Sequence, residues 1–391
     1  MRNKVEKFRV AATVVGTILI LAACESGTPG PELTGRSESP FDLSKVVTAV
    51  EEGASGEVIP GVKVRYEGKA ERADEDAFEG PFTVPGKVEP AKEDDPGGLE
   101  NLDFTFYNVE EGTRFALEVD ADLVQKMLEY DKKARADLGS ERGGEDLEGK
   151  SDLELQHASD DRTVRSPTTS WPWRTIGQLS NGCSGTLVGP SVMVTAAHCV
   201  VSSGNYAFHG FTPARDGNNE PYGDANIVAI TVPSTFVDEA CSRDNWSWTC
   251  VRNDIAVVVL DDDYGFNMGY WYMSWGSLKH KAIYNRGYGN CGSHDAPPSC
   301  EWSRLYGKSG SGSFTGLSHR GANGWSDVAT HDFYTNPGHS GSPTYMYVKG
   351  HAVVTGVHSS GTQNQRGGSA QRFGPSETGR ISFMRNWAAS R

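Results

Sequence analysis

Three short motifs follow one another in the order histidine, aspartate, serine, and they contain the residue types that nucleophilic acyl transfer requires. They are TAAHC at residues 195–199, NDIA at residues 253–256 and GHSGSP at residues 338–343. A serine hydroxyl is a weak nucleophile at neutral pH, so it needs a histidine that takes its proton and an acceptor that orients the histidine. We therefore predict a catalytic triad of His198, Asp254 and Ser340.

Glycine beside the serine supports the same chemistry. A glycine permits a tight turn in which backbone N–H groups converge on one point, and such donors stabilise the negative oxygen of an acyl-transfer transition state. We predict that the N–H groups of Gly338 and Ser340 form this oxyanion hole. Taken singly, His198 could be a core histidine, Asp254 a turn cap and Ser340 a turn residue. Their joint occurrence in these local contexts favours the triad.

Residues 166–391 must position these motifs, and their pattern is that of short strands. Apolar, β-branched runs alternate with Gly, Asn, Pro and Ser turn signals. The expected elements are a hairpin from 185–188 and 192–195, buried strands at 254–260 and 352–357, and a C-terminal helix at 381–387. Such short strands are typical of barrels or sandwiches, and the stretch is long enough for two packed β-barrels.

The N-terminal part of the chain differs in charge. The 391 residues carry a formal net charge of −14, of which residues 25–165 contribute −18 and residues 166–391 contribute +1. No clustered basic stretch indicates nucleic-acid binding, and we expect no nucleic-acid partner. Residues 24–40 are predicted to be a flexible tether, and residues 138–165 a linker and activation region.

Residues 41–137 are predicted to form an α+β or partly disordered propeptide domain. Alternating apolar residues predict strands at residues 104–107 and 115–119. Residues 122–136 predict a single helix.

The first residues predict export. Four basic residues lie among the first nine, and an apolar run over residues 10–23 follows. The run is too short to span a membrane comfortably and suits a signal-peptide core. Its end, Leu-Ala-Ala-Cys24, resembles a bacterial lipobox, which implies that residues 1–23 are removed and that Cys24 is acylated. By the same resemblance, Glu25 favours the outer membrane of a Gram-negative cell, and an ordinary secretory signal is the alternative.

The cysteines agree with an exported protein. If Cys24 is acylated, six cysteines remain for disulfides in an oxidising compartment, and spacing alone leaves 15 pairings open. We favour pairing between neighbours in sequence. The six are Cys183, Cys199, Cys241, Cys250, Cys291 and Cys300. A metal cluster is the alternative, but the chain has no CxxC spacing, so we expect no metal ligands and no cofactor, and only a structural calcium is left open.

The three catalytic motifs resemble those of the chymotrypsin-fold (trypsin-like) serine endopeptidases. The resemblance covers roughly residues 171–391. It implies two six-stranded antiparallel Greek-key β-barrels with a C-terminal helix over residues 166–391, and activity on protein or peptide substrates. Residues 182–188 resemble the family's disulfide-linked hairpin, which implies a Cys183–Cys199 bond. The preceding acidic segment is then interpreted as a propeptide, so the protein is expected to be a zymogen.

Within that family the chain most resembles the bacterial glutamyl endopeptidases. The Ser-Gly-Ser-Pro sequence that begins at Ser340 resembles the nucleophile sequence of those enzymes. Tyr334 stands where trypsin-like enzymes have the aspartate of the specificity pocket, which disfavours substrates with Arg or Lys before the scissile bond. Thr335 matches their pocket hydroxyl, and His358 matches their Gly-Ile-His stretch. A histidine and a hydroxyl can bind a carboxylate through charge-assisted hydrogen bonds. The resemblance therefore implies a preference for Glu or Asp before the scissile bond.

Other features depart from the family or leave alternatives open. His339 precedes the serine where animal zymogens have an aspartate that pairs with the new N-terminus, so that activation switch is expected to be absent. Arg162 and Arg165 offer sites for a helper protease, while the Glu-rich propeptide could be cut by the enzyme itself or occupy its pocket. A catalytically inactive surface-binding homologue and an esterase are the competing functions. We expect a monomer attached to the membrane through its N-terminal lipid.

Overall fold

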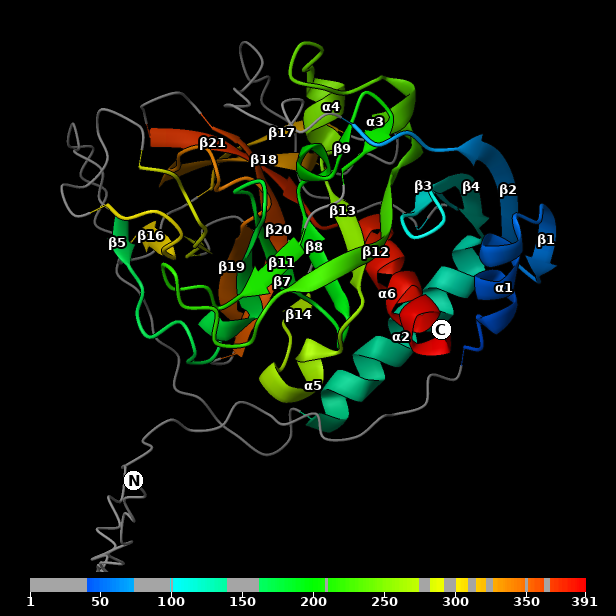
Figure 1. The fold of residues 1–391 in the computed structure, drawn as a ribbon, viewed down its shortest axis with the longest axis horizontal. Coiled ribbons are helices and arrows are strands. Elements are labelled where there is room, and N and C mark those ends of the chain that lie inside the picture. Colours follow the sequence, from blue (N-terminus) through cyan, green and yellow to red (C-terminus); the bar gives the residue numbers. More distant parts are fainter. Residues whose placement is uncertain are drawn as a thin grey trace, which may run out of the picture.

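The structure is a computed structural model, shown as a ribbon in Figure 1. It describes residues 41–73, 99, 101–138, 162–207, 210–273, 282–291, 300–308, 314–320, 326–348, 351–361 and 366–391. The expected signal peptide, the acylated Cys24, the tether and most of the linker therefore lie outside the described residues. Within the described residues, every helix is too short or too polar to cross a bilayer.

Six strands close into an N-terminal barrel. They are β6 (Ile176–Leu179), β7 (Ser184–Leu187), β8 (Val192–Thr195), β11 (Gly210–Pro213), β12 (Ala225–Pro233) and β13 (Ala256–Leu260). The hydrogen-bonded order is β12-β11-β6-β7-β8-β13, and β13 pairs back to β12, which closes the ring. Every residue of β7, β8 and β13 is buried, as their apolar runs predict. The expected hairpin and the strand after Asp254 are confirmed.

A second sheet forms a half-barrel in the described residues and carries the serine motif. Its order is β15-β19-β20-β21-β18-β17, and β14 adds in parallel to β20. The strands are β14 (Tyr272–Met273), β15 (Tyr284–Asn285), β17 (Phe314–Arg320), β18 (Ser326–Tyr334), β19 (Pro343–Val348), β20 (His351–Gly361) and β21 (Arg366–Arg372). The chymotrypsin-like architecture of a closed barrel beside a second barrel-like sheet is thus confirmed (Figure 1), although among the described residues the strand order of the second sheet does not close.

Short elements lie between the strands of the two sheets and before the first barrel. A two-stranded ladder joins β5 (Arg162–Val164) to β16 (Tyr306–Lys308), and another joins β9 (Val201–Ser202) to β10 (Asn205–Tyr206). The connecting helices are α3 (Ser234–Asp238), α4 (Trp248–Arg252), α5 (Tyr264–Met268) and the 3₁₀ turns Trp173–Thr175 and Ala197–Cys199.

The segment predicted to be a propeptide folds against the first barrel. It comprises α1 (Ser44–Glu52), β1 (Gly56–Ile59), β2 (Val62–Lys69), β3 (Leu102–Asn108), β4 (Thr113–Val119) and α2 (Ala121–Leu138), and we call the described residues 41–138 the N-terminal module. The strands and helix expected within residues 102–138 are confirmed. Strand β3 pairs antiparallel with β12, with Phe104 opposite Pro233 at one end and Asn108 opposite Ala229 at the other. The sheet of the module therefore continues that of the barrel.

Helix α6 (Pro375–Ser390) joins the module to the barrels through apolar contacts. Figure 1 shows α6 in red beside α1 and α2. The ring of Trp387 meets that of Phe106 with centroids 5.1 Å apart, and Phe383 meets Phe104 at 5.6 Å. All four side chains are buried in one core with residues from both barrels. The expected C-terminal helix is confirmed and is longer than its apolar spacing indicates.

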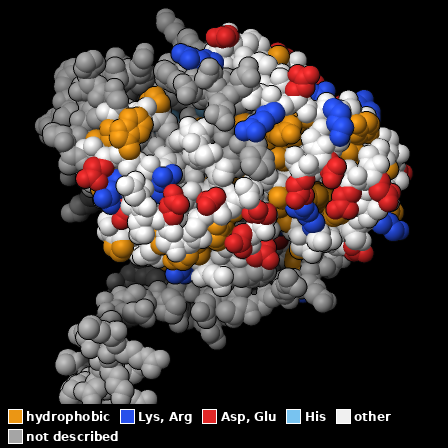
Figure 2. All heavy atoms as spheres, in the orientation of Figure 1, with side chains coloured by type: hydrophobic (Ala, Val, Ile, Leu, Met, Phe, Trp, Pro, Cys, Tyr) orange, Lys and Arg blue, Asp and Glu red, His pale blue; other side chains and the backbone are white. Residues whose placement is uncertain are grey.

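The charges of the module lie on its surface. Lys63 pairs with Glu118 at 3.1 Å and Arg65 with Glu67 at 3.0 Å, and in the first pair both side chains are more than half exposed. Figure 2 shows acidic and basic side chains interspersed on the visible face. Exposed pairs contribute little to stability. The apolar contacts with α6 and the ladder to β12 therefore hold the module in place.

Removal of the Trp387 side chain is expected to destabilise the module and the barrels together. Trp387→Ala should lower the free energy of unfolding by about 3–5 kcal/mol, the usual loss for a buried aromatic residue, because Trp387 is 4% exposed against Phe106. Denaturant unfolding measures this loss. Trp302→Ala is the matched control, since Trp302 is 64% exposed. Equal stability of the two variants would contradict a shared core.

Candidate active site

His198 lies in the 3₁₀ turn after β8, and Asp254 lies two residues before β13. The two buried side chains meet. Asp254 Oδ2 is 2.8 Å from His198 Nδ1, and Asp254 Oδ1 accepts a hydrogen bond of 2.9 Å from the His198 backbone N–H. Because a carboxylate oxygen only accepts hydrogen bonds, we assign the proton to His198 Nδ1. The lone pair of a neutral imidazole then lies on Nε2, the nitrogen that a general base would use.

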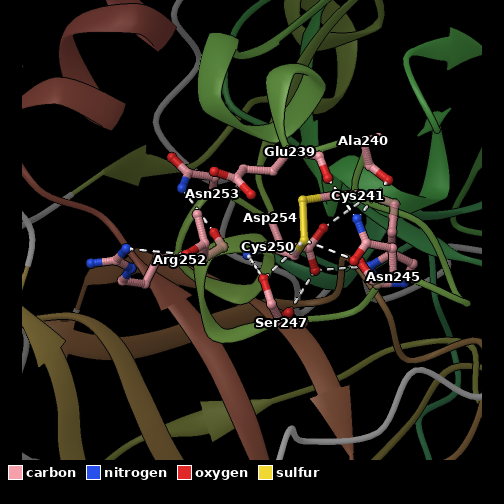
Figure 3. Close-up of a disulfide and its surroundings, with 12 residues drawn as sticks. Glu239, Ala240, Cys241, Asn245, Ser247, Cys250, Arg252, Asn253 and Asp254 are labelled. Atoms are coloured by element: carbon pink, nitrogen blue, oxygen red, sulfur yellow. Dashed lines mark hydrogen bonds and ion pairs between the residues drawn. A yellow bond between two sulfur atoms is a disulfide. The ribbon is translucent and has the colours of Figure 1, made fainter.

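A disulfide-bonded loop leads to Asp254. Cys241 and Cys250 are joined in the described structure, and helix α4 begins after Ser247, whose hydroxyl caps it by accepting from the Cys250 N–H at 3.2 Å (Figure 3). From the same loop, the ring of Trp246 meets the His198 ring edge to face, with centroids 5.4 Å apart. The loop therefore fixes both the position of the aspartate and one side of the imidazole.

The turn that carries Ser340 packs directly against the histidine segment. Gly341 has a φ of +80°, and a Cβ added to it would lie 2.1 Å from Thr195 Oγ1 and 2.8 Å from the backbone nitrogen of Ala196. Any side chain here would clash with backbone, which explains the glycine after the serine. This close approach brings the Ser340 turn against the residues just before His198.

Strand β20 links the turn to the aspartate. The Gly341 N–H donates to the His358 carbonyl and the His358 N–H to the Ser342 carbonyl, each at 2.8 Å. The next residue, Ser359, donates its hydroxyl to Asp254 Oδ2 at 2.6 Å. His358 instead contacts His331, so these two neighbouring residues serve different sites. Sequence reasoning missed the contact of Ser359 with Asp254, although its place beside His358 was the available signal.

The backbone before Ser340 is held in a tight turn. Gly338 has a φ of +97°, and a Cβ on it would lie 2.3 Å from the Tyr288 carbonyl oxygen. The Ser184 hydroxyl donates to the Gly338 carbonyl at 2.7 Å, and the Ser184 N–H donates to the Ser340 carbonyl at 2.8 Å. Within the described residues, neither the Gly338 N–H nor the Ser340 N–H has a protein acceptor, so both can donate to a substrate oxygen.

The two residues predicted for the specificity pocket both lie close to Gly361. A Cβ on Gly361 would be 2.9 Å from Thr335 Oγ1 and 4.0 Å from His358 Nε2. Thr335 is 3% exposed, and its hydroxyl has no hydrogen-bond partner in the described part of the chain. A buried, unsatisfied hydroxyl beside a histidine nitrogen is the arrangement expected where a polar ligand group is to be bound.

A second histidine that the sequence analysis did not single out lies behind the first. His331 Nε2 is 3.0 Å from His358 Nδ1, and both side chains are buried. Burial, and then the neighbouring charge of His331, holds the pKa of His358 well below its ordinary value. Burial lowers the pKa of His331 to about 3. The pair is therefore neutral at neutral pH, and a carboxylate arriving beside His358 would favour its protonated form.

Three disulfides form between neighbours in sequence, as expected. They are Cys183–Cys199, Cys241–Cys250 and Cys291–Cys300. The sulfurs of the first lie within 4.8 Å of a His198 ring nitrogen, but disulfide sulfurs are not the thiolates that ligate metals. This cluster therefore does not act as a metal site while the disulfide is intact.

The chain is similar to known proteins in sequence and in fold. Residues 161–375 match the family model described as Trypsin. The glutamyl endopeptidase of Bacillus licheniformis is 29% identical over 123 residues, 30% of this chain and 36% of that protein. The extracellular metalloprotease of Bacillus subtilis is 41% identical over 80 residues, 17% of this chain and 24% of that protein. The solved structure of Glu endopeptidase in complex with MPD has 23% identity and a TM-score of 0.46, and the match covers 58% of this chain and 97% of that one. The chain thus matches about a third of the length of the first curated relative and about a quarter of the second.

Proposed function

The chain belongs to the trypsin family, and we propose that it is an exported serine endopeptidase in which Ser340 is the nucleophile, His198 the general base and Asp254 the residue that orients the histidine. The observation that carries this proposal is the buried acceptor site of Asp254. Its carboxylate receives hydrogen bonds from the His198 backbone, from His198 Nδ1 and from Ser359, so the imidazole has one orientation and one tautomer.

The proposed reaction proceeds in two acyl-transfer steps. Ser340 Oγ attacks the substrate carbonyl carbon while His198 Nε2 takes the hydroxyl proton, and the N–H groups of Gly338 and Ser340 bind the oxyanion. The imidazolium then protonates the leaving amine, which breaks the peptide bond and leaves an acyl-enzyme. A water molecule repeats the sequence and releases the acid product. Each oxyanion donor typically contributes about 2.7–4 kcal/mol of transition-state stabilisation.

The direct experiment combines covalent labelling with mapping of cut sites. We expect a fluorophosphonate to label Ser340, and we expect an unstructured protein digested by the enzyme to show new termini after Glu or Asp by mass spectrometry. Absence of labelling would favour an inactive homologue. Labelling with ester but no peptide hydrolysis would favour an esterase, and cuts after Lys or Arg would contradict an acid-binding pocket.

We also propose that Thr335 and His358 bind the substrate carboxylate. The unsatisfied Thr335 hydroxyl and the nearby His358 Nε2 support this role, and hydrogen bonds to a charged group are about twice as strong as neutral ones. The His331 ring behind His358 positions it through the 3.0 Å contact. The name of the glutamyl endopeptidase of Bacillus licheniformis agrees with such a preference.

His358→Ala is expected to reduce kcat/KM for Glu substrates by about 10-fold to 100-fold, the equivalent of one charge-assisted hydrogen bond. Substrates with Gln at the same position should lose much less, because they bring no charge to the pocket. Thr335→Val, which keeps the shape but removes the hydroxyl, should change the Glu-to-Gln ratio in the same direction. An equal loss on both substrates would contradict the role of His358.

The termini and processing are proposed from the sequence. We propose that residues 1–23 are removed, that Cys24 is acylated and holds the protein at the membrane, and that the protein is made as a zymogen opened within residues 138–165. The extracellular location stated in the name of the Bacillus subtilis relative supports export. Mass spectrometry of the mature N-terminus tests this, since an unacylated terminus at another residue would contradict the anchor.

A further inference from the structure

An arginine at the start of the catalytic part contacts the residue next to the proposed nucleophile. Arg162 Nη1 is 3.1 Å from His339 Nε2, and both side chains are buried, with exposed fractions of 3% and 0%. The guanidinium carbon lies 5.6 Å from the ring centre of Tyr306 and 5.7 Å from that of Tyr334. Two aromatic rings and a histidine nitrogen thus surround a buried cation.

The direction of the hydrogen bonds can be assigned. A guanidinium only donates, so His339 Nε2 accepts from Arg162 and its proton lies on Nδ1. His339 Nδ1 is 3.2 Å from Asn285 Oδ1, to which it donates. The Asn285 side-chain N–H group donates to Ser342 Oγ at 2.8 Å and to the Pro343 carbonyl at 3.1 Å. One chain of hydrogen bonds therefore holds the residues on both sides of Ser340.

A glycine backbone packs closely against this network. A Cβ on Gly289 would lie 2.4 Å from Arg162 Nη1 and 2.3 Å from His339 Cδ2, so only glycine fits beside the pair. The preceding residue, Tyr288, has its carbonyl oxygen against Gly338, which begins the Ser340 turn. Displacement of His339 would therefore move the backbone that carries the proposed oxyanion donors.

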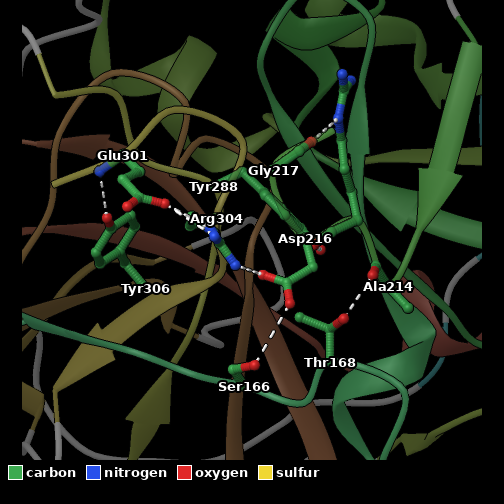
Figure 4. Close-up of polar contacts among 10 residues, drawn as sticks. Ser166, Thr168, Ala214, Asp216, Gly217, Tyr288, Glu301, Arg304 and Tyr306 are labelled. Carbon is green, nitrogen blue, oxygen red and sulfur yellow. Dashed lines mark hydrogen bonds and ion pairs between the residues drawn. The ribbon is translucent and has the colours of Figure 1, made fainter. Parts of the chain in front are cut away.

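The chain that follows Arg162 is held by a strand pairing and by hydrogen bonds to the first barrel. Strand β5 pairs antiparallel with β16, with Arg162 opposite Lys308 and Val164 opposite Tyr306. Figure 4 shows the next residues against the first barrel, where Thr168 Oγ1 donates to the Ala214 carbonyl at 2.6 Å and Ser166 Oγ to Asp216 at 3.4 Å. The segment from Arg162 to Thr168 therefore holds Arg162 in place beside His339.

We propose that Arg162 is a positioning residue that holds the nucleophile turn through His339 and Asn285, and that the active enzyme must retain it. The role rests on the proposed serine endopeptidase activity. In this chain a side chain near the start of the catalytic part contacts the residue that precedes the proposed nucleophile. The activating cut therefore lies before Arg162, and the bonds after Arg162 and Arg165 are not activation sites.

The test replaces Arg162 by Met in the full chain. Methionine fills a similar length between the two tyrosine rings but cannot donate to His339. We expect kcat to fall about 100-fold, as for a displacement of reacting groups by about 1 Å, while KM changes by less than about twofold because Thr335 and His358 are untouched. The rate of fluorophosphonate labelling should fall with kcat. Arg162→Lys, which restores a donor and a charge, should recover part of the loss.

Arg165→Met is the matched control. Arg165 lies three residues further on and stacks on Trp173 at 5.1 Å, so its loss should leave kcat within about twofold. A folded Arg162→Met protein with the kcat of an active wild type would overturn the positioning role alone. An inactive wild type would overturn the proposed function and this role with it.

A second measurement needs no variant and applies even if Arg162→Met does not fold. The N-terminus of the wild-type chain that reacts with fluorophosphonate is expected at Arg162 or earlier. Labelling at the full rate by a native species that lacks Arg162, established by intact mass, would overturn the proposal.

Discussion

Ser340→Ala is expected to lower kcat for peptide cleavage about 10⁶-fold and to abolish fluorophosphonate labelling, the scale of effect found when the nucleophile of a triad is removed. The hydroxyl is the attacking group, and no other atom of the turn can replace it. The structural hydrogen bond of Ser340 uses its carbonyl oxygen, which accepts from the Ser184 N–H at 2.8 Å. The variant should therefore fold and unfold as the wild type does.

Ser170→Ala serves as the control for this change. The Ser170 hydroxyl bonds only locally, to the Pro167 carbonyl at 3.0 Å in an exposed turn, so both activity and melting temperature should be unchanged. Initial rates on a peptide substrate, active-site labelling and thermal unfolding are the measurements. Peptide cleavage by purified Ser340→Ala at even a hundredth of the wild-type kcat would assign the nucleophile to another residue.

Asp254→Asn is expected to lower kcat about 10⁴-fold with little change in KM. The Asp254 carboxylate accepts three hydrogen bonds, from the His198 backbone, from His198 Nδ1 and from the Ser359 hydroxyl. An amide of the same shape has only one accepting oxygen. In either orientation of the introduced amide, its NH₂ group faces one or more of these donors. Where the NH₂ group faces His198 Nδ1, the imidazole proton must move from Nδ1 to Nε2. The imidazole would then no longer present a lone pair to the serine.

Asp262→Asn is the control, since Asp262 lies in an exposed turn eight residues further along the chain. A pH profile distinguishes a tautomer effect from simple loss of the fold. The kcat of Asp254→Asn should recover in part at alkaline pH, where hydroxide can assist proton removal, while a misfolded protein would not recover. A decrease of less than about tenfold in a folded variant would show that Asp254 does not orient the base.

The sequence analysis went furthest where chemistry depends on local pattern. The apolar patterns predict β7, β8, β13 and α6, and the preference for pairing between neighbouring cysteines agrees with the three disulfides that form. It could not predict that β3 of the N-terminal module pairs with β12. This pairing joins backbone N–H and C=O groups, which every strand carries, so it leaves no mark in the residue types of either strand.

Residue types and their order by themselves determined the proposed chemistry, because a nucleophile, a base and an acceptor are recognisable from short motifs. Only the tertiary structure decided which other side chains serve them. Ser359 lies 105 residues from Asp254, and Arg162 lies 177 residues from His339. These contacts depend on how two barrels, a flanking segment and a turn pack together, and packing brings together positions whose separation along the chain carries no signal of contact.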